Sequence, residues 1–192
     1  MGTEEISDFE LMGQLANGDD LALNLLMDRW SSRVTSFLHK MTGQREAAID
    51  LAQETFIKLY HARGRYKPVG HFSTYLFSIS ANLARNHARW KIRHPAISFD
   101  ATRDDGGVEI PELVDAARTP DAAAHAAENA LAVHEAILKL PTDLREAMTL
   151  FVYEGMGYTE IATVSECSPK AVETRIYRAR QILKEQLKDL RP

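Results

Sequence analysis

Residues 61–96 read HARGRYKPVGHFSTYLFSISANLARNHARWKIRHPA, and this stretch decides how the rest of the chain is interpreted. It contains seven basic residues and no acidic residue, although the whole chain has a formal net charge of −4. Aromatic side chains such as Tyr66, Tyr75 and Trp90 are interleaved with the cations. Lys and Arg gain affinity for nucleic acid by releasing counterions, and aromatic rings stack on unpaired bases. The stretch is therefore typical of nucleic-acid binding, and the alternative is a solvated cationic helix face.

The helical phase of this stretch separates its polar side chains from its apolar ones. A helix from about Ser73 to Arg93 is predicted, because Gly and Pro residues break the chain just before it. Its apolar stripe holds Tyr75, Leu76, Ile79, Leu83, His87 and Trp90, and the opposite stripe holds Ser78, Asn82, Arg85, Arg89 and Arg93. Since the basic side chains share one face, the pattern favours nucleic-acid binding over a merely solvated surface.

Charge alternates along the rest of the chain. Residues 97–135 hold nine acidic and two basic side chains, whereas residues 168–192 hold seven basic and three acidic ones. Two basic blocks separated by an acidic one predict two nucleic-acid contacts, joined by a segment that avoids phosphates. Between Pro95 and Pro120 the helical periodicity fails, and several Gly and Pro residues indicate a flexible linker.

The remaining segments predict an all-α chain. Ser7 and Glu10 form a capping box before a short helix, and Gly43 is placed to end a helix in the left-handed conformation. Further helices are expected at about 20–41, 46–62 and 121–140, and from an N-cap at Thr142 onward. We therefore predict two small helical domains, 1–96 and 129–192, joined by a flexible acidic linker at 97–128.

The segment after residue 141 predicts a helix-turn-helix unit. Residues 159–162 form a short helix, residues 165–167 the turn, and Ser168 and Pro169 suit the first two positions of the final helix. The final helix packs through Val172, Ile176, Ala179, Leu183 and Leu187, and it presents Lys170, Glu173, Thr174, Tyr177, Arg178 and Gln181 outward. Such a basic second helix favours binding in the major groove of DNA, and a plain packing hairpin is the alternative.

The predicted helix at 46–62 carries a polar face with Asp50, Gln53, Glu54 and Lys58. Asp50 and Glu54 lie one turn apart, a spacing that a metal-dependent nuclease or other hydrolase could use. No third ligand lies nearby, and Lys58 can pair with Glu54 at i,i+4, so a solvated or protein-binding face is favoured. We expect no catalytic residue, no metal and no cofactor.

Composition is typical of a soluble, cytoplasmic protein. A single cysteine, Cys167, excludes an intramolecular disulfide and fits a reducing compartment. We expect it to be a small packed residue in the turn. No apolar run reaches the length of about 18 residues that a membrane-spanning helix needs, so no membrane insertion is expected. The acidic N-terminus lacks the apolar core of a signal peptide.

Several motifs, taken in order, resemble those of a known family. Residues 50–60 (DLAQETFIKLY) resemble the most characteristic motif of bacterial sigma factors, and residues 72–86 (FSTYLFSISANLARN) resemble the promoter-melting segment that follows it. Residues 140–146 (LPTDLRE), 158–162 (YTEIA) and 175–180 (RIYRAR) resemble the C-terminal domain of the same family. Their order and spacing are similar to the small, two-domain, extracytoplasmic-function type of the sigma-70 family, from about Ile6 to Leu187.

The resemblance implies a non-enzymatic subunit that binds core RNA polymerase and directs initiation from minus-ten and minus-thirty-five promoter elements. The implied polymerase contacts are Asp50, Gln53, Glu54 and Lys58. The implied minus-ten contacts are Tyr75, Asn82, Arg85, Asn86, Arg89 and Arg93, with Asn82 beside a flipped-out base. The implied minus-thirty-five contacts are Lys170, Thr174, Arg175, Tyr177 and Arg178. An anti-sigma factor is the expected regulator. The alternative is a conventional helix-turn-helix regulator of duplex DNA with residues 1–96 as a sensor domain.

Two residues depart from the pattern of the family. Glu173 stands where many relatives place a basic residue, and a carboxylate near phosphates is unfavourable unless it accepts from a cytosine amino group. Tyr75 replaces the Trp often found at its position, which keeps a stacking ring but alters its shape. The resemblance therefore does not determine which minus-thirty-five sequence the chain reads.

Overall fold

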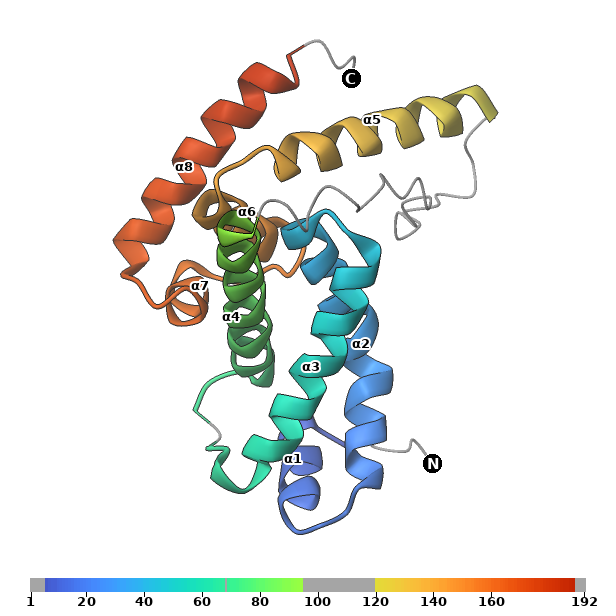
Figure 1. Cartoon of the computed structure of the whole chain (residues 1–192), viewed down its shortest axis with the longest axis vertical. Coiled ribbons are helices and arrows are strands. Elements are labelled where there is room, and N and C mark those ends of the chain that lie inside the picture. Colours follow the sequence, from blue (N-terminus) through green and yellow to red (C-terminus); the bar gives the residue numbers. More distant parts are fainter. Residues whose placement is uncertain (1–5, 68, 95–119, 189–192) are drawn as a thin grey trace.

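The computed structural model describes residues 6–67, 69–94 and 120–188, and helices are the only regular secondary structure within those ranges (Figure 1). In chain order they are α1 (Asp8–Ala16), α2 (Leu21–Thr42), α3 (Arg45–Ala62), the 3-10 turn η1 (Arg63–Arg65), α4 (Phe72–Arg93), α5 (Pro120–Leu138), α6 (Thr142–Val152), α7 (Tyr158–Val164) and α8 (Pro169–Gln186). The predicted all-α class is confirmed. We call α1 to α4 the N-terminal domain and α5 to α8 the C-terminal domain.

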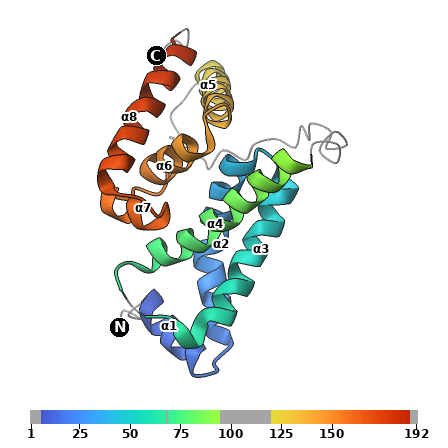
Figure 2. The same cartoon turned by 60° about the vertical axis from the view of Figure 1, so that its left-hand side comes forward.

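The N-terminal domain packs α2, α3 and α4 side by side, with α1 against α2 (Figures 1 and 2). Aromatic rings fill the space between these helices: Trp30 meets Phe72 edge-on with centroids 5.7 Å apart, and Phe37 meets Phe77 at 5.3 Å. All four rings are buried. Burying each such side chain stabilises the fold by about 1.5–3 kcal/mol, so this aromatic core fixes the position of α4.

Most helix ends follow the predicted chemistry. The Ser7 hydroxyl accepts from the Glu10 amide, while the Glu10 carboxylate accepts from the Ser7 amide, which completes the capping box. Gly43 ends α2 with a φ of 70°, and the Ser168 hydroxyl caps α8. The predicted N-cap at Thr142 is wrong: Pro141 is the N-cap, because its carbonyl already accepts from the Arg145 amide. Thr142 is therefore the first helical residue.

Two large apolar residues lie outside the core, and periodicity had predicted one of them, Trp90, for the apolar stripe of its helix. Trp90 is 44% exposed and stacks on His94, with ring centroids 4.9 Å apart, near the C-terminal end of α4. Ile49 is 40% exposed, because the buried stripe of α3 runs through Ala48, Ala52 and Phe56 and leaves it at the edge. A period of 3.6 residues gives the direction of a stripe but not its width.

The C-terminal domain contains the predicted helix-turn-helix unit in α7 and α8. Helix α6 packs on α8. Ile137 of α5 and Leu140, which follows α5, join a core shared with Leu144 and Leu183. The predicted helix at 121–140 is confirmed as α5, so residues 120–128, assigned above to the linker, are helical. The remaining predicted linker, residues 97–119, lies outside the described residues. The domain boundaries themselves stay predictions.

The two domains are packed against each other, an arrangement that the sequence left open. Helix α4 lies between α2 and α3 on one side and α6 and α7 on the other (Figure 2). Buried side chains of both domains, such as Leu76 and Ala81 of α4 and Ala147 and Ile161 of the C-terminal domain, belong to one continuous apolar cluster. Separating the domains would therefore expose apolar surface as well as polar contacts.

Candidate polymerase and promoter interfaces

The outer face of α3 presents the predicted polymerase contacts together. Asp50, Gln53, Glu54 and Lys58 are all exposed. The Lys58 ammonium lies 3.4 Å from a Glu54 carboxylate oxygen, which is the predicted i,i+4 pair. The exposed side chains of Ile49 and Ile57 share this helix. Large apolar side chains beside polar ones at a surface are typical of a protein-binding face.

The outer face of α4 carries four of the predicted minus-ten contacts in exposed positions. Asn82, Asn86, Arg89 and Arg93 are exposed, and α4 contains no acidic residue. The guanidinium of Arg89 donates to the Asn86 side-chain oxygen at 2.7 Å, which holds an amide and a cation next to each other. This face offers hydrogen-bonding groups for a base and positive charge for a phosphate. The exposed Trp90 adds an aromatic ring near this face that the sequence interpretation had assigned to the core.

Tyr75 lies at the opposite end of α4 in a group of aromatic rings. Its ring centroid is 5.0 Å from that of Tyr66, whose ring in turn lies 6.3 Å from Phe72. Burial raises the pKa of both Tyr75 and Tyr66. The Tyr75 ring is thus half-buried, with one side packed against Tyr66.

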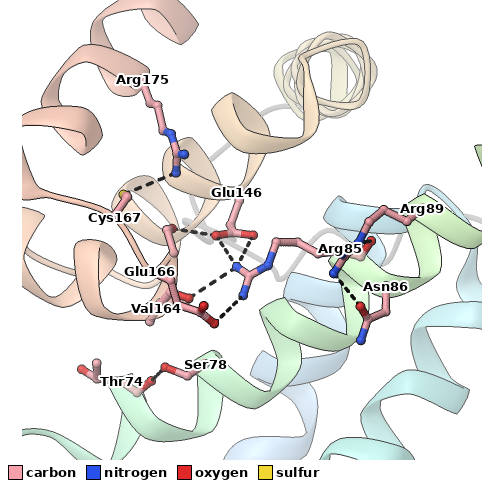
Figure 3. A network of polar contacts seen from close by, with 11 residues as sticks. Thr74, Ser78, Arg85, Asn86, Arg89, Glu146, Val164, Glu166, Cys167 and Arg175 are labelled. Carbon is pink, nitrogen blue, oxygen red and sulfur yellow. Dashed lines mark hydrogen bonds and ion pairs between the residues drawn. The ribbon is translucent and has the colours of Figure 1, made fainter.

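Arg85 is the predicted minus-ten contact that does not point outward. Its Nη1 donates to both carboxylate oxygens of Glu146, at 2.9 and 3.0 Å, and Nη2 lies 3.5 Å from an oxygen of Glu166 (Figure 3). The Ser165 hydroxyl donates to the same Glu146 carboxylate at 2.6 Å. Burial raises the pKa of Glu146, against the opposing effect of these hydrogen bonds. The sequence interpretation did not single out Glu146 as an Arg85 partner, because the two residues are far apart in the chain.

The first half of α8 presents four of the five predicted minus-thirty-five contacts. Lys170, Thr174, Tyr177 and Arg178 are exposed. Arg175 is not: its side chain is 26% exposed, with Nη1 donating to the Cys167 sulfur at 3.5 Å and Nε lying 3.6 Å from Asp143. Arg175 therefore joins α8 to the turn and to the start of α6.

Glu173, the acidic departure on this face, has a partner. The Lys170 ammonium donates to its carboxylate at 2.7 Å. The negative charge of Glu173 thus lies against a cation of the preceding turn, which reduces its repulsion of a nearby phosphate. Lys170, one of the predicted DNA-binding cations, is therefore engaged in an ion pair with Glu173.

The carboxylates of Asp50 and Glu54 are not grouped with a third side chain, in the part of the chain that the structure describes, that could complete a metal site. Within the described residues, no three His, Cys, Asp or Glu side chains are grouped so that they could hold a metal ion. Asp50 and Glu54 lie on an exposed helix face, and Glu54 is paired with Lys58. In the same ranges, no helix is long and apolar enough to cross a membrane.

Comparisons with known proteins agree with this two-domain geometry. The family model "Sigma-70 region 2" matches residues 26–93, and the model "Sigma-70, region 4" matches residues 130–183. The RNA polymerase sigma-H factor of Pseudomonas aeruginosa is 34% identical over 99% of this chain and 98% of its own length. The ECF RNA polymerase sigma-E factor of Haemophilus influenzae is 31% identical over 97% of this chain and 98% of its own length.

Solved structures share the fold of both domains. The structure of CnrH in complex with the cytosolic domain of CnrY is 25% identical, with a TM-score of 0.66 over 94% of this chain and 97% of that one. The sigma factor RpoE in complex with the anti-sigma factor NepR from Bartonella quintana has a TM-score of 0.64 at 20% identity, over 88% of this chain and 98% of that one. The chain belongs to the sigma-70 family, as a sigma factor of the extracytoplasmic-function type.

Proposed function

We propose that the chain docks on core RNA polymerase through α3, reads the minus-ten element through α4 and reads the minus-thirty-five element through α8. Its function as a sigma factor in transcription initiation follows from its family. A conventional regulator with a sensor domain does not account for the match of residues 26–93 to Sigma-70 region 2. We further propose that it works in the cytoplasm and has no catalytic activity of its own.

The observation that carries the assignment of α4 is its exposed, acid-free polar face. Asn82, Asn86, Arg89 and Arg93 are exposed on a helix whose opposite side is anchored in an aromatic core. A rigid helix that presents two amides and two guanidinium groups can hold a phosphate and form hydrogen bonds with an unpaired base at the same time. The nearby Trp90 offers a surface on which a base can stack.

The assignment of α8 rests on the exposure of its first half. Lys170, Thr174, Tyr177 and Arg178 follow the N-terminus of the second helix of a helix-turn-helix unit, the end that enters the major groove in such units. Arg175 contacts Cys167 of the turn and Asp143 of α6 instead of pointing outward. We therefore propose that Arg175 affects DNA binding indirectly, by holding α8 in position.

Regulation by an anti-sigma factor is part of the proposal. CnrH, the related structure of 25% identity, is in complex with the cytosolic domain of CnrY. We propose that a protein of this kind binds the present chain and withholds it from polymerase.

Run-off transcription with purified core polymerase tests the proposed docking. The chain should direct transcripts from promoters mapped after its overexpression, and core polymerase alone should not. The double variant Asp50→Lys, Glu54→Lys reverses the charge of the α3 face and should weaken binding to core polymerase about ten-fold or more. Glu185→Lys, an exposed acid on α8, is the matched control and should bind as the parent does. Equal binding by all three proteins would refute docking through α3.

A further inference from the structure

The first half of α8 carries one carboxylate among its exposed side chains. Residues 170–178 include the cations Lys170, Arg175 and Arg178, and Glu173 is the only acidic residue in this range. The Lys170 ammonium donates to a Glu173 carboxylate oxygen at 2.7 Å, and the two side chains are 80% and 52% exposed. The surface proposed to meet DNA therefore presents a donor and an acceptor within hydrogen-bond distance of each other.

Helix stability does not account for the position of Lys170. The N-terminus of a helix has a partial positive charge, so it favours acidic side chains and disfavours basic ones. Lys170 is nevertheless the second residue of α8, and the first turn of this helix contains no acidic residue. The pair with Glu173 offsets this little, because water screens an exposed ion pair. The placement of a cation against the helix dipole indicates a partner outside the helix.

The pair matches the edge of one kind of base pair in the major groove. Guanine presents two adjacent acceptors there, O6 and N7, and its partner cytosine presents the N4 amino donor. Guanine O6 and cytosine N4 are hydrogen-bonded to each other, so they lie about 2.9 Å apart. This separation is close to the 2.7 Å between the Lys170 and Glu173 groups. An ammonium has three donors, so it can bond to O6 and N7 while the carboxylate accepts from N4.

The same two side chains fit the other bases less well. An ionised carboxylate only accepts hydrogen bonds, so the acceptors of guanine and thymine repel it. Adenine has an N6 amino donor, but this donor lies between adenine N7 and thymine O4, which are both acceptors. Since an acceptor that faces another acceptor in an interface costs affinity, Glu173 selects by excluding bases as well as by binding one.

We propose that Lys170 and Glu173 together read one G·C base pair of the minus-thirty-five element, with the ammonium on guanine O6 and N7 and the carboxylate on cytosine N4. The inference rests on the proposed function, because it takes the first half of α8 as the part that enters the major groove. Glu173 also lines a hollow between α7 and α8, together with Tyr158 and Tyr177. DNA that covers this hollow excludes water, which strengthens the hydrogen bond to the carboxylate.

Changing the protein and the base pair together tests this reading. Core polymerase carrying the full chain is bound to a mapped promoter, in which each minus-thirty-five base pair is changed in turn to the other three. Filter binding should show that the parent prefers cytosine over adenine about ten-fold at one position. Glu173→Gln should prefer adenine at that position, because a Gln amide bonds to adenine N6 and N7.

Two comparisons separate this reading from a general effect of charge. Glu185→Gln removes the same charge from another exposed i,i+3 pair, that of Glu185 with Lys188, and should leave every base preference within about two-fold of the parent. Replacing the paired guanine by 7-deazaguanine removes N7, and it should weaken binding of the parent about three-fold. Lys170→Met should bind the two promoters equally, because the donor to N7 is then absent.

Identical base preferences in the parent and in Glu173→Gln would overturn the inference. Tighter binding of Glu173→Gln to all promoters alike would also overturn it, because the carboxylate would then only repel phosphates. Either result would leave the proposed function intact, since the parent would still direct transcription from its promoter. A parent that shows no base preference anywhere in the minus-thirty-five element would instead refute the reading of this element by α8.

Discussion

Arg145 is a structural cation that joins three helices, and its replacement by Met is the most informative test of how the chain is held together. Its Nη1 donates to the Met41 carbonyl at the end of α2, at 2.6 Å. Its Nη2 donates to the carbonyl of Leu138, the last residue of α5, and to the carbonyl of Leu140 just beyond it, the latter at 3.0 Å. The last carbonyls of a helix lack partners within the helix, so one guanidinium satisfies the ends of two helices at once.

The cost of the substitution follows from these acceptors. A hydrogen bond from a charged donor contributes about 1.5–3 kcal/mol, and Met fills similar space without donating. Part of the loss is offset, because the guanidinium is partly buried and burial lowers its pKa. We therefore expect Arg145→Met to lower the free energy of unfolding by about 2–4 kcal/mol.

Urea unfolding at pH about 7.5, followed by circular dichroism, measures this free energy. Arg178→Met is the matched control, because Arg178 is exposed on α8, and its free energy of unfolding should stay within about 0.5 kcal/mol of the parent. If Arg145→Met were as stable as this control, the carbonyl contacts would contribute no stability and Arg145 would not hold the three helices together.

Three further predictions concern helix α4 and the contact between the two domains. Arg89→Ala should weaken open-complex formation and lower the slope of its salt dependence by about one unit. Filter binding at several salt concentrations measures this slope, and an unchanged slope would mean that Arg89 contacts no phosphate. Asn82→Ala should instead relax the base preference at one minus-ten position while general affinity changes less than about two-fold, and a uniform loss across all sequences would contradict this role. His39 of α2 and His134 of α5 stack with ring centroids 5.1 Å apart, and burial lowers the pKa of both. Their contribution to the free energy of unfolding is therefore complete above about pH 6.5, and it is lost as the pH falls through the lowered pKa values. The parent should therefore lose more stability than His134→Gln between pH about 7.5 and 5.5 in urea unfolding, and equal losses would refute this linkage.

Much of the fold could be predicted from the sequence, because it depends on local chemistry. Ser7, Gly43 and Ser168 each act at a helix end through their own backbone or side-chain geometry, so their roles could be predicted without knowledge of the rest of the chain. The phase of α4 placed Asn82 and Arg89 on the outer face for the same reason. Such features depend on neighbours within about one helical turn.

Features that depend on distant segments could not be predicted in this way. Arg85 shares the sequence phase of Arg89, yet it faces Glu146 because the C-terminal domain packs on that part of α4. Arg175 turns inward because Asp143 of α6 and the turn residue Cys167 lie beside it in the fold. Trp90 is exposed because the packed part of α4 stops short of it. Each outcome is set by which helix lies opposite, and periodicity carries no information about that.

We propose that this chain opens promoter DNA only together with polymerase, and permanganate footprinting of unpaired thymines measures this opening directly. On a supercoiled template with a mapped promoter, we predict reactive thymines in the minus-ten element when both the chain and core polymerase are present, and none with either alone. Binding of duplex DNA by the chain alone, without thymine reactivity when polymerase is added, would show that the chain does not open promoters as a sigma factor.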